Sequence, residues 1–166
     1  WKALKELTKE NPDFRRDFQL KLIGAVSQEV LDTISEFRLN DYVLNLGYVS
    51  HQEAVEHQRK SQILLLIEIN SNDTKSIIPG KLFEYMVSER PILALGPEGS
   101  DFAEIITSTN TGVFFLYDEL EQLKALLLKY YNLYKEQNLK VHAVGLQQYS
   151  RKSLTEQLSK LLTQNS

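Results

Sequence analysis

The chain has 166 residues, 42% of them hydrophobic and 25% charged, which is ordinary for one globular domain with its own core. Its formal net charge of -3 argues against a nucleic-acid partner, because such proteins usually carry a basic patch, and the absence of cysteine excludes disulfides and thiolate metal sites. No apolar stretch approaches the length of a membrane span, and we expect a cytoplasmic protein.

Strands alternate with helices along the whole chain, which predicts a doubly wound α/β domain, 1–166, with a parallel sheet covered on both faces. The run ILLLI at 63–67 is apolar throughout, which is typical of a central strand buried on both faces. The predicted strands are 18–23, 42–49, 63–67, 92–95 and 112–116. The predicted helices are a first one that Asn11-Pro12 ends, then 27–37, 50–60, 79–87, 100–106, 118–135 and 149–162.

Polar side chains mark several of the predicted helix starts. Ser50 and Glu53 have the spacing of a capping box, in which each side chain accepts from the other residue's backbone N–H. The other predicted caps are Ser27, Ser100, and Asp118 together with Glu121. The last helix places four leucines on one stripe, and the final residues, 163–166, are expected to fray.

The segment 77–86, IIPGKLFEYM, is the most informative part of the sequence because it opens a helix with Pro-Gly. Pro79 suits the first turn of a helix, and Gly80 allows an anion to approach the backbone N–H groups there. Lys81 adds a cation, and Glu84, one turn on, offers a carboxylate that can accept from sugar hydroxyls. This pattern predicts a nucleotide site, with phosphate at the helix start and ribose one turn further in.

The position of this segment in the fold supports the same interpretation. Residues 68–76 form a polar loop at the carboxyl end of the strand 63–67, and ligands of doubly wound sheets bind outside the carboxyl ends of the strands. The residues alone leave a second interpretation open, in which Gly80 only starts a helix and Glu84 forms a surface ion pair with Lys81.

Together with PILALGPEGSDFAEII at 91–106, this segment resembles the carboxyl-terminal domain of retaining GT-B glycosyltransferases that build bacterial surface polysaccharides. The resemblance covers nearly the whole chain and is specific over 78–95, where the family pattern reads P-[SG]-K-[LI]-F-E-Y-[ML] followed by P-[IV]-[LI]-A. It implies a Rossmann-like three-layer domain that binds a nucleoside-diphosphate sugar. The implied role of Glu84 is to accept hydrogen bonds from both ribose hydroxyls.

The resemblance also implies contacts to the other parts of the donor. Many relatives carry a second Glu, which touches the donor sugar, where this chain has Ser76. We expect backbone and hydroxyl groups of four consecutive residues to line the sugar pocket: Thr74, Lys75, Ser76 and Ile77. In the family, the segment that corresponds to Gly47-Tyr48-Val49 borders the nucleobase, and a glycine like Gly24 lies close to the ligand. For Tyr48 plain packing is the alternative, and for Gly24 a simple turn.

A full domain of this family begins with a strand and a glycine-bearing loop, and both are missing before Trp1. Because the first strand is central in the usual Rossmann order, its loss predicts a gap in the sheet. The chain also lacks an initial Met, so we expect a fragment of a two-domain enzyme that is not active alone.

The function expected from the resemblance is the donor-binding half of a glycosyltransferase that moves a sugar to a glycan or lipid-linked acceptor. The acceptor would bind through a missing amino-terminal domain, and peripheral association of the full enzyme with the inner face of the membrane is compatible with a lipid-linked acceptor. No catalytic residue is assigned. We expect no metal and no cofactor besides the nucleotide sugar, because the chain lacks an Asp-x-Asp motif and its histidines lack metal-ligand spacing.

Two rival functions fit the same sequence. A nucleotide-sugar epimerase of the same fold would turn over the donor without an acceptor. A non-catalytic α/β ligand-binding or interaction module would keep the scaffold without binding a nucleoside diphosphate at Gly80.

Overall fold

The structure is a computed structural model, and it describes residues 1–164. The chain divides into two compact units, each of which is described by itself: the first comprises Trp1–Lys60 and Tyr117–Leu139, and the second comprises Ser61–Leu116 and the residues from Lys140 onward. Both units contain parallel strands joined through helices, so the predicted α/β class is confirmed. Of the residues expected to fray, 163–166, the first two belong to the last helix, Arg151–Gln164, and 165–166 lie outside the described residues. The single domain 1–166 with three layers stays a prediction.

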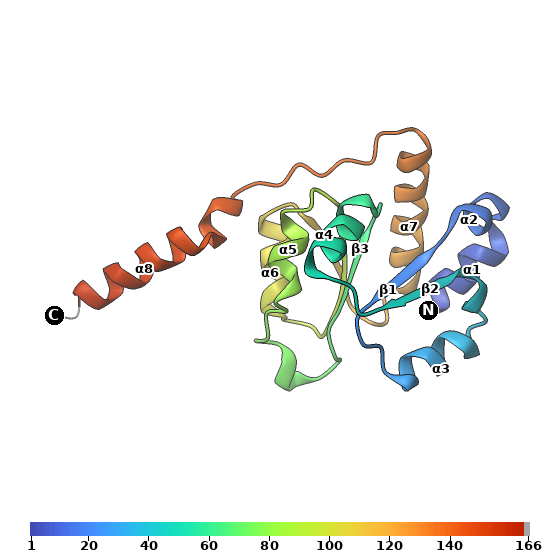
Figure 1. Cartoon of the computed structure of the whole chain (residues 1–166), viewed down its shortest axis with the longest axis horizontal. Coiled ribbons are helices and arrows are strands. Elements are labelled where there is room, and N and C mark those ends of the chain that lie inside the picture. Colours follow the sequence, from blue (N-terminus) through green and yellow to red (C-terminus); the bar gives the residue numbers. More distant parts are fainter. Residues whose placement is uncertain (165–166) are drawn as a thin grey trace. The chain divides into compact units, whose positions relative to one another are not determined.

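The first unit holds a two-stranded parallel sheet in which Leu20 of β1 is aligned with Val43 of β2 (Figure 1). A hydrogen bond of 2.7 Å from Gly24 N–H to the carbonyl of Gly47 continues the pairing beyond the strands. The elements of this unit are α1 (Lys2–Glu10), α2 (Pro12–Asp17), β1 (Leu20–Ile23), α3 (Gln28–Glu36), the 3-10 helix η1 (Asn40–Tyr42), β2 (Val43–Gly47), α4 (His51–Lys60) and α7 (Leu120–Lys135).

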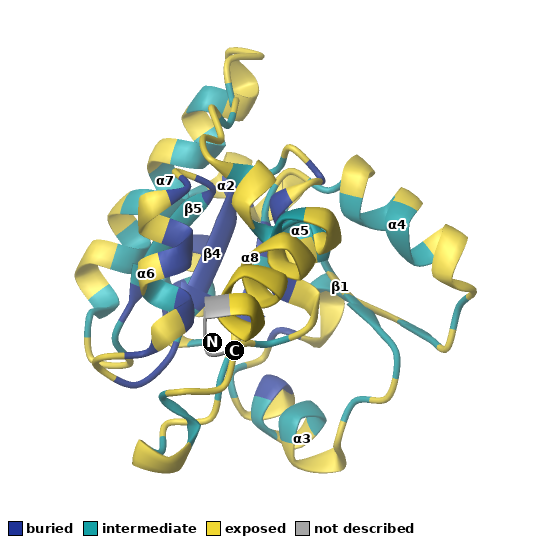
Figure 2. Ribbon diagram, turned by 90° about the vertical axis from the view of Figure 1, so that its left-hand side faces the viewer, coloured by how far each residue is buried: buried dark blue, intermediate teal, exposed yellow. Residues whose placement is uncertain are grey.

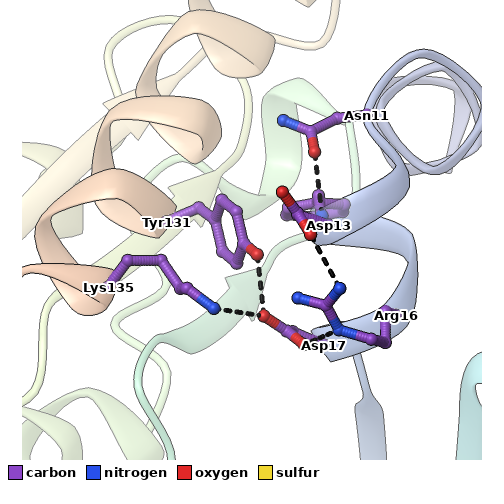
Figure 3. Close-up of polar contacts among 7 residues, drawn as sticks. Asn11, Asp13, Arg16, Asp17, Tyr131 and Lys135 are labelled. Atoms are coloured by element: carbon purple, nitrogen blue, oxygen red, sulfur yellow. Dashed lines mark hydrogen bonds and ion pairs between the residues drawn. The ribbon is translucent and has the colours of Figure 1, made fainter.

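In the first unit, side-chain contacts join α7 to the two amino-terminal helices. Lys124 Nζ lies 2.7 Å from Glu6 Oε2 on α1. On α2, Asp17 accepts hydrogen bonds from the Tyr131 hydroxyl and from Lys135 Nζ (Figure 3). These contacts hold together residues that are more than a hundred positions apart in the sequence.

The second unit holds a three-stranded parallel sheet in the order β3-β4-β5, with Leu64 aligned with Ile92 and Ile92 with Gly112. Its elements are β3 (Leu64–Ile67), η2 (Asn72–Thr74), α5 (Lys81–Met86), β4 (Ile92–Leu95), α6 (Asp101–Ser108), β5 (Gly112–Phe115), η3 (Leu146–Tyr149) and α8 (Arg151–Gln164). Every strand pair in this sheet is linked through a helix, as parallel pairing requires.

The core of the second unit lies where α5 and α6 pack on the sheet. Apolar side chains from both helices and from β4 are almost completely buried there, and β4 carries the colour of buried residues in Figure 2. The rings of Phe102 and Phe114 meet edge to face with centroids 5.4 Å apart. The buried members are Leu66, Leu82, Met86, Ile92, Ala94, Phe102, Ile105 and Ile106, with Leu146 and Tyr149 of η3 packed against them.

Two predictions about the sheet have different outcomes. The ladders of residues 1–164 form two sheets, β1-β2 and β3-β4-β5, and the expected gap between them, with a further strand to fill it, stays a prediction. The predicted central position of the run 63–67 is wrong for the described sheet, because β3 is its edge strand and the Ile67 side chain is 48% exposed.

The start of the chain differs from its prediction, because Asn11-Pro12 ends one helix and begins another. Pro12 is the first residue of α2, and Asn11 caps this helix by accepting a hydrogen bond of 2.9 Å from Phe14 N–H. A proline fits a first helical position, where the missing N–H has no intrahelical partner. Residues 18 and 19, predicted as strand, instead follow this second helix before β1 begins at Leu20.

The predicted caps also have mixed outcomes. The capping box of Ser50 and Glu53 is confirmed, with a backbone-to-side-chain bond in each direction, and Ser27 accepts from Val30 N–H. The Ser100 hydroxyl instead donates to the carbonyl of Pro97, so this predicted cap is wrong. The predicted cap by Asp118 is also wrong, because α7 begins one residue later and its N-cap, Glu119, makes no capping bond.

Candidate functional site

The candidate site of the second unit begins with the loop that follows β3. Its conformation is set by its own hydroxyl groups: the Thr74 hydroxyl lies 2.7 Å from the carbonyl of Ile69 and 2.9 Å from that of Ser71. Ser71 in turn accepts a hydrogen bond from Asp73 N–H. The hydroxyls of Ser71 and Thr74 therefore stabilise the loop itself.

The carboxyl-terminal half of this loop is exposed. Ser76 is exposed, and its hydroxyl has no hydrogen-bond partner within residues 1–164. Ile77 and Ile78 follow with 47% and 40% exposure, and Ile69 is 71% exposed. The loop thus offers one hydroxyl group among isoleucine side chains.

A backbone contact attaches this loop to the next helix of the same unit. Asp101 N–H, in the first turn of α6, donates a hydrogen bond of 2.9 Å to the carbonyl of Lys75. At the same edge, Glu68 N–H donates to the carbonyl of Leu95, which is the last residue of β4. The loops after β3 and β4 therefore lie together at the carboxyl end of the sheet, where α/β proteins bind ligands.

Gly80 and Lys81 lie at the start of α5, and both are exposed. The helix begins at Lys81, so it is shorter than the predicted 79–87, and Gly80 precedes it with φ -56° and ψ -30°. These are helical angles that any residue adopts, and a Cβ added at Gly80 would meet no atom within 4 Å. The fold therefore does not require glycine at this position.

Glu84 is half-buried, one turn into α5, while Leu82 and Met86 face the core. The alternative of a surface ion pair with Lys81 is wrong within the described chain, because Lys81 forms no ion pair there. Burial, and secondly the charge of Glu84, raise the pKa of Tyr85. The negative charge of Glu84 therefore disfavours ionisation of the Tyr85 hydroxyl.

The remaining candidates lie in the first unit, at the carboxyl ends of β1 and β2. Gly24 has φ +98° and Gly47 has φ +61°, angles that side-chain-bearing residues rarely adopt. The Tyr48 side chain is 87% exposed, so the packing alternative for this ring is wrong, and Val49 is half-buried. The simple-turn interpretation of Gly24 fits its angles.

The structure therefore brings the candidates together in two groups. Gly24, Tyr48 and Val49 belong to the first unit, and Ser76, Ile77, Gly80, Lys81 and Glu84 belong to the second. That both groups bind one ligand stays a prediction. Residues 1–164 contain no group of three or more His, Asp or Glu side chains that could hold a metal ion, and none of their helices is long and apolar enough to cross a bilayer.

Sequence reasoning missed the contact between Lys75 and Asp101, because backbone-to-backbone bonds between loops leave no mark in side-chain chemistry. The glycine-rich turn at 96–99 was the only signal near it. In comparisons with known proteins, no protein-family model matches the chain, and no curated protein matches it.

Proposed function

We propose that this protein is the donor-binding half of a glycosyltransferase that moves a sugar from a nucleoside-diphosphate sugar to a glycan or lipid-linked acceptor. The resemblance over 78–95 supports this proposal. The exposed helix start beside the carboxyl end of β3 supports it as well, because this edge is where α/β sheets bind nucleotides.

One observation carries the proposal: Gly80 is a glycine that the fold does not require. Its backbone angles are helical and the space around its Cα is open. Close approach of a phosphate to the backbone gives a reason for glycine here, because a side chain at the first turn would keep the anion away from the N–H groups. Lys81, exposed and without an ion pair in residues 1–164, supplies a cation at the same place.

The proposed roles combine this placement of Gly80 and Lys81 with what the resemblance implies for the other residues. The N–H groups at Gly80 and Lys81 bind the diphosphate, and Glu84 accepts from the ribose hydroxyls. Ser76 and Ile77 contact the donor sugar, while Gly24, Tyr48 and Val49 border the base. As the glycosidic bond breaks, negative charge grows on the departing diphosphate, and the N–H groups and Lys81 stabilise this charge. No divalent ion takes part in this scheme.

The test is titration calorimetry of the protein with UDP, GDP, ADP and CMP, with and without a chelator. We expect selective micromolar binding of one nucleotide, unchanged by the chelator. Glu84→Ala should weaken binding of the ribonucleotide but change binding of its 2′-deoxy analogue much less, whereas Glu104→Ala, an exposed carboxylate on α6, is the control. Equal losses for both ligands would remove Glu84 from the ribose site.

Lys81→Ala provides the second arm. It should weaken binding of the nucleoside diphosphate more than binding of the nucleoside, because only the diphosphate carries negative charge that Lys81 can attract. No detectable binding of any of the four nucleotides would instead favour the non-catalytic module. Turnover of a nucleotide sugar without any acceptor would favour the epimerase.

A further inference from the structure

The loop between β3 and α5, light green in Figure 1, contains a threonine to which the proposed function gives no role. The hydroxyl of this residue, Thr74, lies 2.7 Å from the carbonyl oxygen of Ile69 and 2.9 Å from that of Ser71, and its one proton serves both. The carbonyl of Thr74 in turn accepts a hydrogen bond of 3.0 Å from Ile77 N–H. Thr74 therefore links the part of the loop before it to the part after it.

The residue that follows Thr74 attaches the loop to α6. The carbonyl of Lys75 accepts a hydrogen bond of 2.9 Å from Asp101 N–H, a first-turn group that has no partner within its own helix. Helix α6 is itself held in the core of this unit, where Phe102 and Ile106 are completely buried. The loop is thus held between two fixed elements, β3 at one end and α6 at the other, with Thr74 between them.

Two of the proposed donor-sugar contacts, Ser76 and Ile77, depend on this attachment. They follow Lys75 directly, and both side chains are exposed, so packing does not hold them in place. The proposed nucleotide contacts are different, because Leu82 and Met86 anchor α5 in the buried core. Loss of the Thr74 hydroxyl should therefore loosen the sugar contacts and leave the start of α5 where it is.

We propose that Thr74 is a positioning residue for the donor sugar, and that its hydroxyl holds the loop in the conformation that meets the sugar. This inference rests on the proposed donor site and deepens it. A loop that is ordered before the ligand arrives loses less conformational entropy on binding, and that saving appears as affinity. Thr74 acts through Ser76 and Ile77, since its own proton is used within the loop.

The experiment compares nucleotides with their sugar-bearing forms in titration calorimetry. The pairs are UDP with UDP-glucose or UDP-N-acetylglucosamine, GDP with GDP-mannose, and ADP with ADP-glucose. The pair that is followed is the one in which the wild-type protein binds the sugar form more tightly. Thr74→Val keeps the shape of the side chain and removes the hydroxyl. It should weaken binding of the nucleotide sugar about fivefold, as expected for the loss of one hydrogen bond, and leave binding of the nucleotide unchanged.

Two further variants serve as controls. Thr74→Ser keeps the hydroxyl and should bind both ligands as the wild type does. Thr107→Val should change neither affinity, although Thr107, which is exposed on α6, also donates its hydroxyl proton to a carbonyl, that of Ala103 at 2.8 Å. Amide hydrogen exchange gives a second readout, in which Thr74→Val should speed exchange in residues 69–77 but not in residues 81–86.

The results that overturn this inference differ from those that overturn the proposed function. Equal weakening of nucleotide and nucleotide sugar by Thr74→Val would mean that Thr74 only supports the fold. Unchanged binding of both ligands would remove Thr74 from the site, and so would nucleotide binding that no sugar strengthens in the wild type. In these three cases the nucleotide site at Gly80 and Lys81 stands. No binding of any nucleotide would overturn the proposed function and this inference with it.

Discussion

The Tyr131 hydroxyl on α7 donates a hydrogen bond of 2.7 Å to Oδ2 of Asp17, the last residue of α2 (Figure 3). Lys135 Nζ lies 2.9 Å from the same oxygen, and Arg16 Nε lies 3.0 Å from Oδ1. These contacts favour the charged carboxylate, and in that order they hold the pKa of Asp17 far below its usual range.

Asp17 should therefore make the stability of the protein depend on pH in the acid range. Its pKa is lower in the folded chain than the value of about 3.9 in an unfolded one, so its contribution is complete above that value and is lost as the pH falls below it. We expect Asp17→Asn to lower the melting temperature at neutral pH, and the difference from wild type to shrink below about pH 4. Asp13→Asn is the control, because Asp13 is 66% exposed and pairs only at the surface with Arg16.

Two glycines of the second unit should respond in opposite ways to alanine. A Cβ at Gly112 would overlap the carbonyl group of Ile92 on the neighbouring strand, so Gly112→Ala should lower the free energy of unfolding by about 3 kcal/mol or more. Gly80→Ala meets open space at helical angles and should raise it by about 0.4 to 1 kcal/mol. Urea unfolding measures both.

Gly80→Ala also separates stability from binding. If a phosphate approaches the backbone at this position, the more stable variant should bind the nucleoside diphosphate more weakly in calorimetry. Unchanged affinity would mean that Gly80 only starts the helix.

Tyr48→Ala tests whether the first unit takes part in nucleotide binding. The ring is 87% exposed, so its removal should leave the melting temperature unchanged. If the ring stacks on the base, the variant should bind the nucleotide about 1 to 3 kcal/mol more weakly, the range seen for aromatic stacking on single bases. Tyr48→Phe should keep the affinity, and a loss in this variant would point to the hydroxyl rather than to stacking.

Three of the described helices, α3, α6 and α7, are followed by a residue in the left-handed conformation; after α6 it is Asn110, a residue type that tolerates it, whereas after α3 and α7 glycine would relieve strain. Arg38, after α3, has φ 56°, and Gln137, after α7, has φ 55°. At each end the next N–H bonds back to the helix, from Leu39 to Ile34 and from Asn138 to Leu133. Because this left-handed conformation is unfavourable for residues with a Cβ, Arg38→Gly and Gln137→Gly should each raise the free energy of unfolding by up to about 1 kcal/mol. Arg38→Ala should bring no such gain.

The parts of the fold that were predicted from sequence depend on local chemistry. The capping box of Ser50 and Glu53 involves residues three apart, and both of its bonds are present. The five strands could be predicted because each is a short apolar run, and these runs alternate with segments whose apolar residues have helical spacing. Asn11-Pro12 was misread because the same pair of residues suits both the end of one helix and the start of the next, and only tertiary packing decides between them.

The parts that were missed depend on partners far away in the sequence. Nothing near Asp17 indicates that Tyr131 and Lys135 will meet it, and nothing in the run 63–67 tells an edge strand from a central one. For the site, the sequence placed Gly80, Lys81 and Glu84 correctly at the start of α5. It could not show that the hydroxyls of Ser71 and Thr74 are used by the loop itself.

The pairing of Lys124 with Glu6 has a consequence for synthesis of the protein. Lys124 is 118 residues further along the chain than Glu6, so the first helix leaves the ribosome well before its partner on α7 exists. At about 5 to 20 residues per second, this delay is roughly 6 to 24 s. During that time Ala3 and Leu7, which are buried in the finished protein, lack the cover of α7 and are open to chaperones.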